Sequence, residues 1–435
     1  MGLPKILVLI IFALTYVFII ALPKYKVLVT LITAVLSTTV CLIANKMDFI
    51  DLLTAIDYNV IMMLFGIMLT VGLFADSGMP NKLSEKMISK MPNALTAIVL
   101  LSVISGVVSA FVDNVATVLM LAPIGLAVSK KMNISPIPVI ISIAVSSNLQ
   151  GAATLVGDTT SVMLGGYADM SFLDFFFMDG KLSIFWAVEI GMLLTIPVLI
   201  IIFRKNNTKL SYQAENVKVK TLVPSILLIL NMALLVIFSF VENKPAITNG
   251  IICMAIGIIA LIYDAVKFKS NVIETTKTAV DLESVGFLLL LFILINAVDK
   301  VGIIADISSL FAKVGSKNLF LLYTVIVFGS VLVSAFIDNI PYVATMLPVI
   351  SGLLASIPGG EAAAPVLYFG LLTGATLGGN ITPFGASANI VGIGILKKEG
   401  YQVNNSDFFK IGLPFTLVAV LAGYAFIWLV WGIGL

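Results

Sequence analysis

The sequence carries one pair of adjacent polar residues twice, each time inside a strongly apolar segment. SAFVDNVATVLMLAPI, residues 109–124, returns without a gap as SAFIDNIPYVATMLPV, residues 334–349, and seven of the 16 aligned positions are identical. The shared positions include Asp113-Asn114 and Asp338-Asn339. Ionisable residues are costly at membrane depth, so they usually mark a functional site there. Carboxylate and amide oxygens are hard ligands, and this chemistry predicts binding of Na⁺.

The same carboxylates could carry protons. Burial disfavours the charged form of a carboxylate, so a buried aspartate can exchange protons near neutral pH. The chain has no His, which is the usual side chain that titrates there, and its two cysteines indicate neither a disulfide framework nor a cysteine metal site. Asp113 and Asp338 could instead simply cap the helices that follow, a role compatible with ion binding. The Na⁺ candidates are therefore Asp113, Asn114, Asp338 and Asn339, with Na⁺ or H⁺ as the coupling ion and no other cofactor expected.

Composition places these pairs in a membrane. Hydrophobic residues make up 60% of the 435 and charged residues 11%, with a mean hydropathy of +1.13, which the polar surface of a water-soluble domain could not sustain. A helix needs roughly 20 apolar residues to cross about 30 Å of hydrocarbon. We therefore expect an all-α polytopic membrane protein. Eight stretches have that length, at approximately 6–22, 27–45, 58–76, 183–203, 221–241, 247–266, 284–299 and 411–433.

Four further apolar regions are interrupted. Regions 94–130 and 318–358 break at the Asp-Asn pairs, which predicts re-entrant helical hairpins. Regions 136–168 and 364–396 break at GAATLVGDTTSV and GNITPFGASANI, which predicts helices broken near the midplane. Irregular backbone at that depth is tolerated only where it is buried in protein or lines a cavity.

The two broken helices add candidate ligands. Asp158 is a third intramembrane acid, and its counterpart in the second half is Ala386, so the halves are not expected to bind the same thing. Small residues also allow close packing of membrane helices, which accounts for several of the glycines. Thr117 of the first hairpin could offer a hydroxyl, although Thr in a membrane helix more often bonds its own backbone. Beside the Asp-Asn pairs, the candidates are Thr117, Thr154, Gly157, Asp158, Ser161, Thr382, Gly385, Ser387 and Asn389.

The repeat divides the chain into halves, 1–203 and 221–435, joined by a polar linker at 204–220. Each half would hold about five crossings and one hairpin, and an odd number of crossings inverts the second half relative to the first. With the linker in the cytoplasm, 18 of the 25 basic residues fall inside and seven outside, as the positive-inside rule requires. The two hairpins would then enter from opposite sides, and their tips could meet at mid-membrane.

These motifs resemble those of the ion transporter superfamily, in particular the group of arsenite permeases, NhaD-type sodium/proton antiporters and the P protein. The two Asp-Asn segments are similar to its hairpin motifs, and GAATLVGD and GATLGGNITPFGASANIVG to its broken-helix motifs, so the resemblance covers nearly the whole chain. Dicarboxylate/sodium symporters of the superfamily have Ser-Asn-Thr at both tips, where this chain has Asp113-Asn114-Val115 and Asp338-Asn339-Ile340. The resemblance implies a homodimeric scaffold and a transport domain that moves across the membrane. We expect the protein to lie in the cell membrane.

Three buried acids, asparagine ligands and no evident intramembrane cation predict a secondary active transporter working by alternating access, which exchanges Na⁺ or Li⁺ for H⁺. The alternative is cation-coupled transport of another solute, either efflux of arsenite or antimonite or uptake of a di- or tricarboxylate. An enzyme is not expected: Leu155 stands where the GxGD motif of intramembrane aspartyl proteases requires its first Gly. We expect a small ion or anionic solute as partner, and no nucleic acid.

Overall fold

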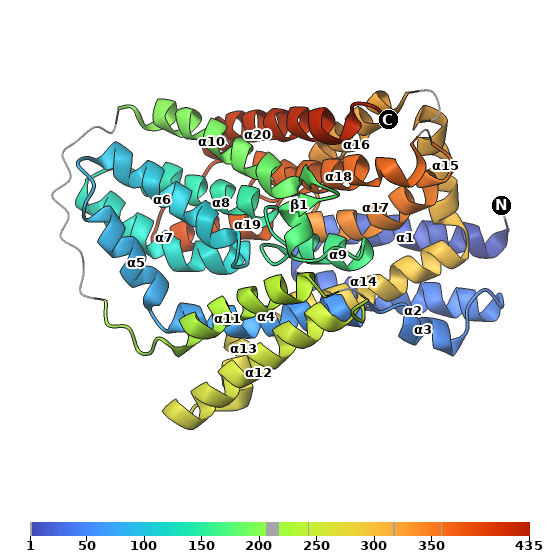
Figure 1. Cartoon of the computed structure of the whole chain (residues 1–435), viewed down its shortest axis with the longest axis horizontal. Helices are drawn as coiled ribbons and strands as arrows, with labels where there is room; N and C mark the ends of the chain where they lie inside the picture. Colours follow the sequence, from blue (N-terminus) through green and yellow to red (C-terminus); the bar gives the residue numbers. More distant parts are fainter. Residues whose placement is uncertain (1, 206–216, 242, 316–317, 358) are drawn as a thin grey trace.

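The computed structural model describes residues 2–205, 217–241, 243–315, 318–357 and 359–435. The described chain is almost entirely helical, which confirms the predicted all-α class (Figure 1). Within it, one short pair of antiparallel strands occurs, β1 (Phe177–Met178) with β2 (Lys181–Leu182). Residues 206–216 of the predicted linker, and residue 358 at the end of the second predicted hairpin, lie outside the described residues.

The helices follow one another in the same order in both halves. The first half contains α1 (Leu3–Ala21), α2 (Lys26–Ile43), α3 (Phe49–Thr54), α4 (Tyr58–Asp76), α5 (Met79–Ile88), α6 (Ala94–Ser109), α7 (Asn114–Lys131), α8 (Pro136–Gly151), α9 (Thr159–Tyr167) and α10 (Ile184–Phe203). The second contains α11 (Val223–Ser239), α12 (Thr248–Phe268), α13 (Val272–Ala279), α14 (Leu282–Lys300), α15 (Ile303–Gly315), α16 (Leu319–Ser334), α17 (Asn339–Leu354), α18 (Ala364–Gly378), α19 (Ser387–Lys398) and α20 (Asn405–Ile427). Short 3₁₀ turns lie at Pro23–Tyr25, Leu173–Phe175, Gly360–Ala363 and Gly379–Ile381, and a π turn at Trp428–Gly432 follows α20.

Equivalent helices begin and end on equivalent residues. Asp57 caps α4 and Asp281 caps α14, each through its side chain. The same two helices are followed by Gly78 and Gly302, whose φ angles of 77° and 79° lie in the left-handed region that favours glycine. The helical pattern therefore repeats because the local signals in the sequence repeat. In Figure 1, α5, α6 and α7 lie at one end of the long axis and α15, α16 and α17 lie toward the other. The opposite orientation of the two halves in the membrane stays a prediction.

Eight helical segments of the described chain are long and apolar enough to cross a membrane. Seven of them correspond to predicted spans. The predicted span 221–241 is α11, which has 17 residues and is therefore shorter, and the eighth segment is instead Gly360–Ile381, in the second interrupted region. The short helices α3, α5, α13 and α15 were not predicted, because a search for stretches of about 20 apolar residues passes over them. The eight segments are Leu3–Ala21, Lys26–Ile43, Phe49–Asp76, Ile184–Phe203, Thr248–Phe268, Leu282–Lys300, Gly360–Ile381 and Asn405–Gly432.

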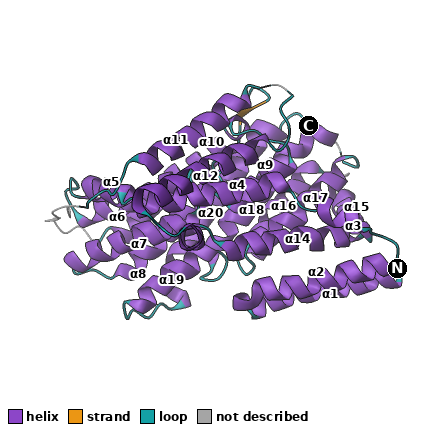
Figure 2. Cartoon of the chain, turned by 90° about the horizontal axis from the view of Figure 1, so that it is seen from below, coloured by secondary structure: helices purple, strands orange, loops and turns teal. Residues whose placement is uncertain are grey.

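Helices α4 and α12 pack at backbone distance. A Cβ atom added to Gly66 would collide with the carbonyl group of Cys253, and one added to Gly257 would lie 2.6 Å from the carbonyl oxygen of Gly66. Small residues permit this approach between membrane helices. The equivalent pair in the repeat is α14 with α2, where the Cys41 thiol donates to the carbonyl of Ala297 at 3.6 Å. Figure 2 shows α1 and α2 side by side along one edge of the molecule.

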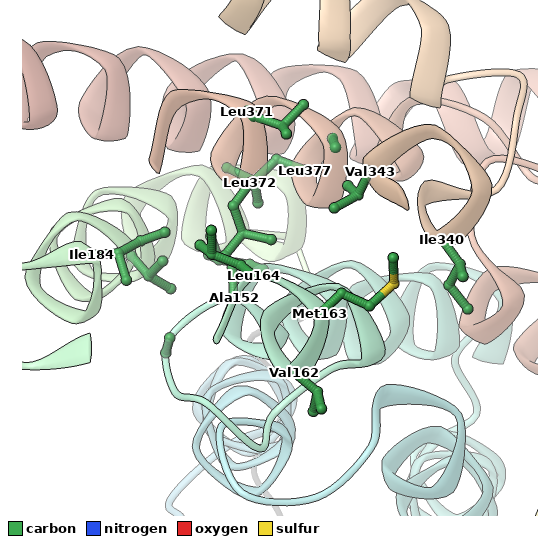
Figure 3. Packing of buried hydrophobic residues seen from close by; sticks show 14 of the residues in the cluster. Ala152, Val162, Met163, Leu164, Ile184, Ile340, Val343, Leu371, Leu372 and Leu377 are labelled. Carbon is green, nitrogen blue, oxygen red and sulfur yellow. The ribbon is translucent and has the colours of Figure 1, made fainter. Parts of the chain in front are cut away.

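The core lies where the interrupted regions of the two halves meet. Helix α9 of the first half packs against α17 and α18 of the second. Figure 3 shows Met163 and Leu164 of α9 near Val343 of α17 and Leu377 of α18, all of them buried. Contacts with the second half thus help to position α9, and with it Asp158 at its start.

Candidate functional site

Both hairpin regions turn at an aspartate that caps the following helix. Helix α6 ends at Ser109 and α7 begins at Asn114, and Oδ1 of Asp113 accepts from the backbone N–H groups of Val115 and Ala116 at 3.0 and 3.2 Å. A short polar side chain in this position satisfies the free N–H groups of a helix start. The bonds occupy one oxygen of the carboxylate, so capping is compatible with a second role.

The second tip is tied to the second broken helix. Asp338 caps α17, with Oδ1 accepting from the N–H of Ile340 at 3.3 Å. Its Oδ2 accepts from the hydroxyl of Ser387 at 3.0 Å. Ser387 is the first residue of α19, so the carboxylate lies between the starts of two helices.

The first broken helix brings Asp158 to the second hairpin. Helix α8 ends at Gly151, and α9 begins at Thr159 with Asp158 as its cap. Oδ1 of Asp158 accepts from the N–H of Thr159 at 2.8 Å. Oδ2 accepts from the hydroxyl of Thr160 at 2.8 Å and from the amide of Asn339 at 3.1 Å. Asp158 thus joins the first half to the tip of the second hairpin.

The reverse connection, from the first hairpin to the second broken helix, contains only amides. Asn114 donates to the side chain of Asn148 at 3.0 Å. The Asn148 amide donates in turn to the side-chain oxygens of Asn380 at 2.8 Å and Asn389 at 3.0 Å. All four are buried. One crossing between the halves is therefore neutral and the other carries a carboxylate, which is the asymmetry expected from Asp158 and its counterpart Ala386.

A cavity of about 30 Å³ lies where the tips and breaks converge. Four carboxylates line it, and no Lys or Arg is found among its described lining residues. Each of the four acids is the cap of a helix: Asp113 of α7, Asp158 of α9, Asp281 of α14 and Asp338 of α17. The complete lining is Met68, Asp113, Asn114, Val115, Asp158, Thr159, Asp281, Ser284, Asp338, Asn339, Ile340 and Ser387.

This arrangement favours a bound cation. The partial positive charge at four helix starts stabilises carboxylates, but carboxylates that share one cavity repel each other. Because the described lining has no basic side chain, a bound cation or protons would offset the charge that the helix starts leave uncompensated. A volume of about 30 Å³ holds one or two water molecules or a small cation. It is too small for a tricarboxylate such as citrate.

Six of the predicted ligands line this cavity, and the others shape its walls. Five hydroxyl or amide residues of the second group bond to backbone carbonyls. Two glycines allow the breaks to touch the hairpin tips: a Cβ atom on Gly157 would lie 3.0 Å from the carbonyl oxygen of Ser109, and one on Gly385 would lie 2.8 Å from that of Ser334. The lining residues are Asp113, Asn114, Asp158, Asp338, Asn339 and Ser387. The backbone-bonded residues are Thr117 with Val112, Thr154 with Ala110, Ser161 with Gly151, Thr382 with Ala335, and Asn389 with Gly379 and Thr382.

Sequence reasoning missed Asp281 and Ser284. Asp281 precedes the long apolar span at 284–299, as Asp57 precedes the one at 58–76. Its local signal, an aspartate that caps a long apolar helix, is shared by Asp57, which does not line the cavity, so this signal alone could not have identified Asp281. The side chains of Met68, Val115, Thr159 and Ile340 complete the lining and were also not predicted.

Several known proteins have sequences or folds similar to this chain. The chain is 28% identical to the 46 kDa membrane protein of Mycobacterium leprae, over 98% of each chain. It is 24% identical to the P protein of Homo sapiens, over 86% of this chain and 53% of that protein. The crystal structure of the Alcanivorax borkumensis YdaH transporter superposes with a TM-score of 0.57 at 16% identity, covering 84% of each chain, which shows a common fold.

The bacterial relatives and the eight apolar segments make this a multi-span transporter of the plasma membrane. Residues 7–374 match the CitMHS family, described as citrate transporter, and the chain therefore belongs to that family within the ion transporter superfamily.

Proposed function

We propose that this transporter exchanges Na⁺ or Li⁺ for H⁺ across the membrane. The observation that carries the proposal is the convergence of Asp113, Asp158, Asp281 and Asp338 on one small cavity whose described lining has no basic residue. Such a site binds positive charge and repels anions. Its oxygen ligands are hard and its volume suits a dehydrated ion.

Exchange follows from competition for the same oxygens. When a cation leaves, the repulsion between neighbouring carboxylates favours protonation, and when a cation returns, it displaces those protons. A carrier that moves the site across the membrane both with a bound cation and with bound protons exchanges the two without a separate proton path. The tips of two hairpins and the starts of two broken helices are the kind of irregular backbone at which transporters hold coupling ions.

A second candidate is cation-coupled transport of a di- or tricarboxylate, which the description of the family supports. An anion meets four carboxylates here, so it could bind only after cations had neutralised them. The cavity would also have to widen, because it holds little more than a dehydrated ion. In this alternative the same aspartates hold the coupling cation rather than the substrate.

The test is proton movement in proteoliposomes with a pH-sensitive dye inside. We expect saturable proton movement on addition of Na⁺ or Li⁺ without any organic anion, and no response to choline. The Asp113→Asn, Asp338→Asn double variant keeps both helix caps, because Asn caps as well as Asp, and loses this response. The control is Asp306→Asn, which removes an exposed carboxylate that pairs with Lys5 at the surface.

The outcomes separate the two candidates. Cation-driven proton movement in the absence of other solutes, lost in the double variant and kept in the control, supports exchange. Silence with cations alone, together with cation-dependent uptake of radiolabelled citrate, would replace exchange by the second candidate. Arsenite or antimonite in place of citrate tests efflux of those solutes in the same preparation.

We also propose a homodimer as the working assembly. This part rests on the resemblance to the superfamily, whose scaffold domains pair. The mass of the detergent-solubilised protein, measured by light scattering with the detergent contribution subtracted, tests it. A mass of one chain at all protein concentrations would contradict it.

A further inference from the structure

The starts of α4 and α14 are equivalent in sequence but differ in surroundings. Oδ1 of Asp281 accepts from the N–H of Ser284 at 3.1 Å, and both residues line the ion cavity. Oδ1 of Asp57 accepts from the N–H of Val60 at 3.0 Å in the same way. Neither Asp57 nor Val60 lines the cavity. The starts of α4 and α14 therefore share the same capping contact but occupy different positions relative to the cavity.

Asp57 and Val60 are packed instead against the broken helix of their own half. A Cβ atom on Gly166 of α9 would lie 2.5 Å from Cγ2 of Val60 and 2.8 Å from Oδ2 of Asp57. Val60 is buried in this contact. The start of α4 thus packs directly against α9, and a side chain at position 166 would require the side chains of Val60 and Asp57 to shift.

The equivalent contact in the second half is absent. The repeat that pairs Gly151 with Gly379 pairs Gly166 with Gly394 of α19. A Cβ atom on Gly394 would have no described atom of another element within 4 Å. Asp281 and Ser284, which correspond to Asp57 and Val60, lie at the cavity rather than on this glycine. We call the start of α4, which packs against Gly166, the closed end, and the start of α14, which lines the cavity, the open end.

We propose that the two helix starts exchange these positions during transport. In the alternative conformation, Asp57 and Val60 line the ion cavity, and Asp281 and Ser284 close onto Gly394. The inference rests on the proposed function to the extent that it assumes alternating access. It adds Asp57 as a fifth acid that meets the ion, on the opposite side of the membrane from Asp281.

The open end lies on the side of the linker between the halves. Helix α13, which immediately precedes Asp281, lines a second cavity of about 670 Å³ together with Asp76 and Lys220. Lys220 is the last residue of the predicted linker, and it forms an ion pair with Asp76 at 2.8 Å. The proposed orientation of the linker makes this the cytoplasmic side.

The exchange also predicts unequal ion binding on the two sides. On the linker side the ion meets the carboxylate of Asp281 and the hydroxyl of Ser284. On the other side it would meet the carboxylate of Asp57 and the methyl groups of Val60, which offer no oxygen. The half-saturating cation concentration should therefore be higher when the ion is supplied from the side opposite to the linker.

Disulfide trapping tests the exchange without any assumption about the solute. The pair Val60→Cys with Gly166→Cys should form a disulfide in the conformation described here, because the side chain of Val60 already reaches Gly166. The pair Ser284→Cys with Gly394→Cys should form one only in the alternative conformation. Both are made in a background with Cys41→Ala and Cys253→Ala, and each is oxidised in membranes and detected by mobility on a gel.

Accessibility of single cysteines gives the second measurement. With a membrane-impermeant maleimide, Ser284→Cys should react from the linker side, and Val60→Cys from the opposite side. The Ser284–Gly394 disulfide should lower the rate of maleimide labelling of Asp281→Cys by at least tenfold. The labelling rate of Val60→Cys should be the same or higher with this disulfide than without it. Gly394→Leu should have the opposite effect on Val60→Cys, because Leu fits the open conformation and blocks closure. Gly329→Leu is the control, since Gly329 is also helical and uncovered.

The outcomes also separate this inference from the proposed function. Both disulfides forming, with opposite effects on labelling, supports the exchange even if no Na⁺ or Li⁺ is transported. Cation-driven proton movement combined with failure of the Ser284–Gly394 disulfide, and with Val60→Cys unreactive from both sides, overturns the exchange and leaves the proposed function intact. If Gly394→Leu does not fold, the disulfide pairs still decide.

Discussion

The side-chain amide of Asn339 donates to Oδ2 of Asp158 at 3.1 Å, which ties the tip of the second hairpin to the broken helix of the first half. This bond joins a ligand candidate from each half inside the cavity that holds four carboxylates. It also gives the site its asymmetry, because the equivalent connection runs from Asn114 through Asn148 of the same half to Asn380 and Asn389 of the second half and contains only amides. The proposed cation site therefore depends on contacts between the halves and not on either half alone.

Asn339→Leu should weaken cation binding. A hydrogen bond to a charged group contributes about 1.5–3 kcal/mol, and its loss favours the protonated form of Asp158. We expect the Na⁺ or Li⁺ concentration for half-maximal proton movement to rise about tenfold, since about 1.4 kcal/mol corresponds to that factor. Asn318→Ala is the control: Asn318 caps α16 on the same hairpin region, outside the cavity. An unchanged cation dependence in Asn339→Leu would remove Asn339 from the site.

Asn148→Ala should destabilise the fold more than it alters the site. The side chain of Asn148 is buried and bonds those of Asn114, Asn380 and Asn389, which would each lose a partner. A buried polar group without a partner costs about 1–3 kcal/mol, so the thermal unfolding temperature in detergent should fall by several degrees.

The matched control is Thr373→Val. Thr373 is buried on α18, and its hydroxyl has no hydrogen-bond partner among the described groups. Replacing it by the isosteric Val should leave the unfolding temperature unchanged or raise it. Equal effects of the two substitutions would show that the asparagine network contributes no stability.

The residues that the sequence predicted at the cavity are those marked by repeated local signals. Asp113 and Asp338 stand at the same place in two copies of one segment, and each caps a helix as short polar residues do, so composition and spacing were sufficient. Asp281 has the same local signal as Asp57, and only the tertiary packing decides which of them reaches the cavity. No local pattern contains that information.

Polar residues in the breaks have a structural role that the sequence did not separate from binding. Asn389 was predicted as a ligand, but its amide donates to the carbonyls of Gly379 and Thr382, which helix formation leaves free at a break. A broken helix inside a membrane must satisfy these groups internally. Polar residues therefore gather there for structural reasons as well as for binding, and the residue type alone does not separate the two.

Gly385→Ala should prevent correct folding rather than change cation affinity alone. The new Cβ atom would lie 2.7 Å from the carbonyl oxygen of Gly379 and 2.8 Å from that of Ser334, and backbone atoms cannot move aside as a flexible side chain can. We expect most of the protein to be lost from the monodisperse peak in size-exclusion chromatography. Gly329→Ala, where no described atom of another element lies within 4 Å, should be recovered at the normal level.

Asp281→Asn should separate charge from capping. Asn and Asp are equally good helix caps, so the stability of α14 should not change. The cavity loses one of its four carboxylates, and we expect the half-saturating cation concentration to rise about tenfold or more, a difference of roughly 1.4 kcal/mol. Asp48→Asn, at the cap of α3 and outside the cavity, is the control. If both variants behave alike, Asp281 takes no part in ion binding.

Cation binding should weaken as the pH falls. Protons neutralise the carboxylates that hold the cation, so the dissociation constant for Na⁺ or Li⁺, measured by thermal shift of the purified protein, should rise on acidification. Linkage requires a rise of about tenfold per pH unit if one proton is released for each cation bound. The slope should be smaller in Asp158→Asn, which has one carboxylate fewer to protonate, and unchanged in Asp306→Asn at the surface. A dissociation constant that does not vary with pH would show that cations and protons do not share this site, and exchange by direct competition would then be wrong.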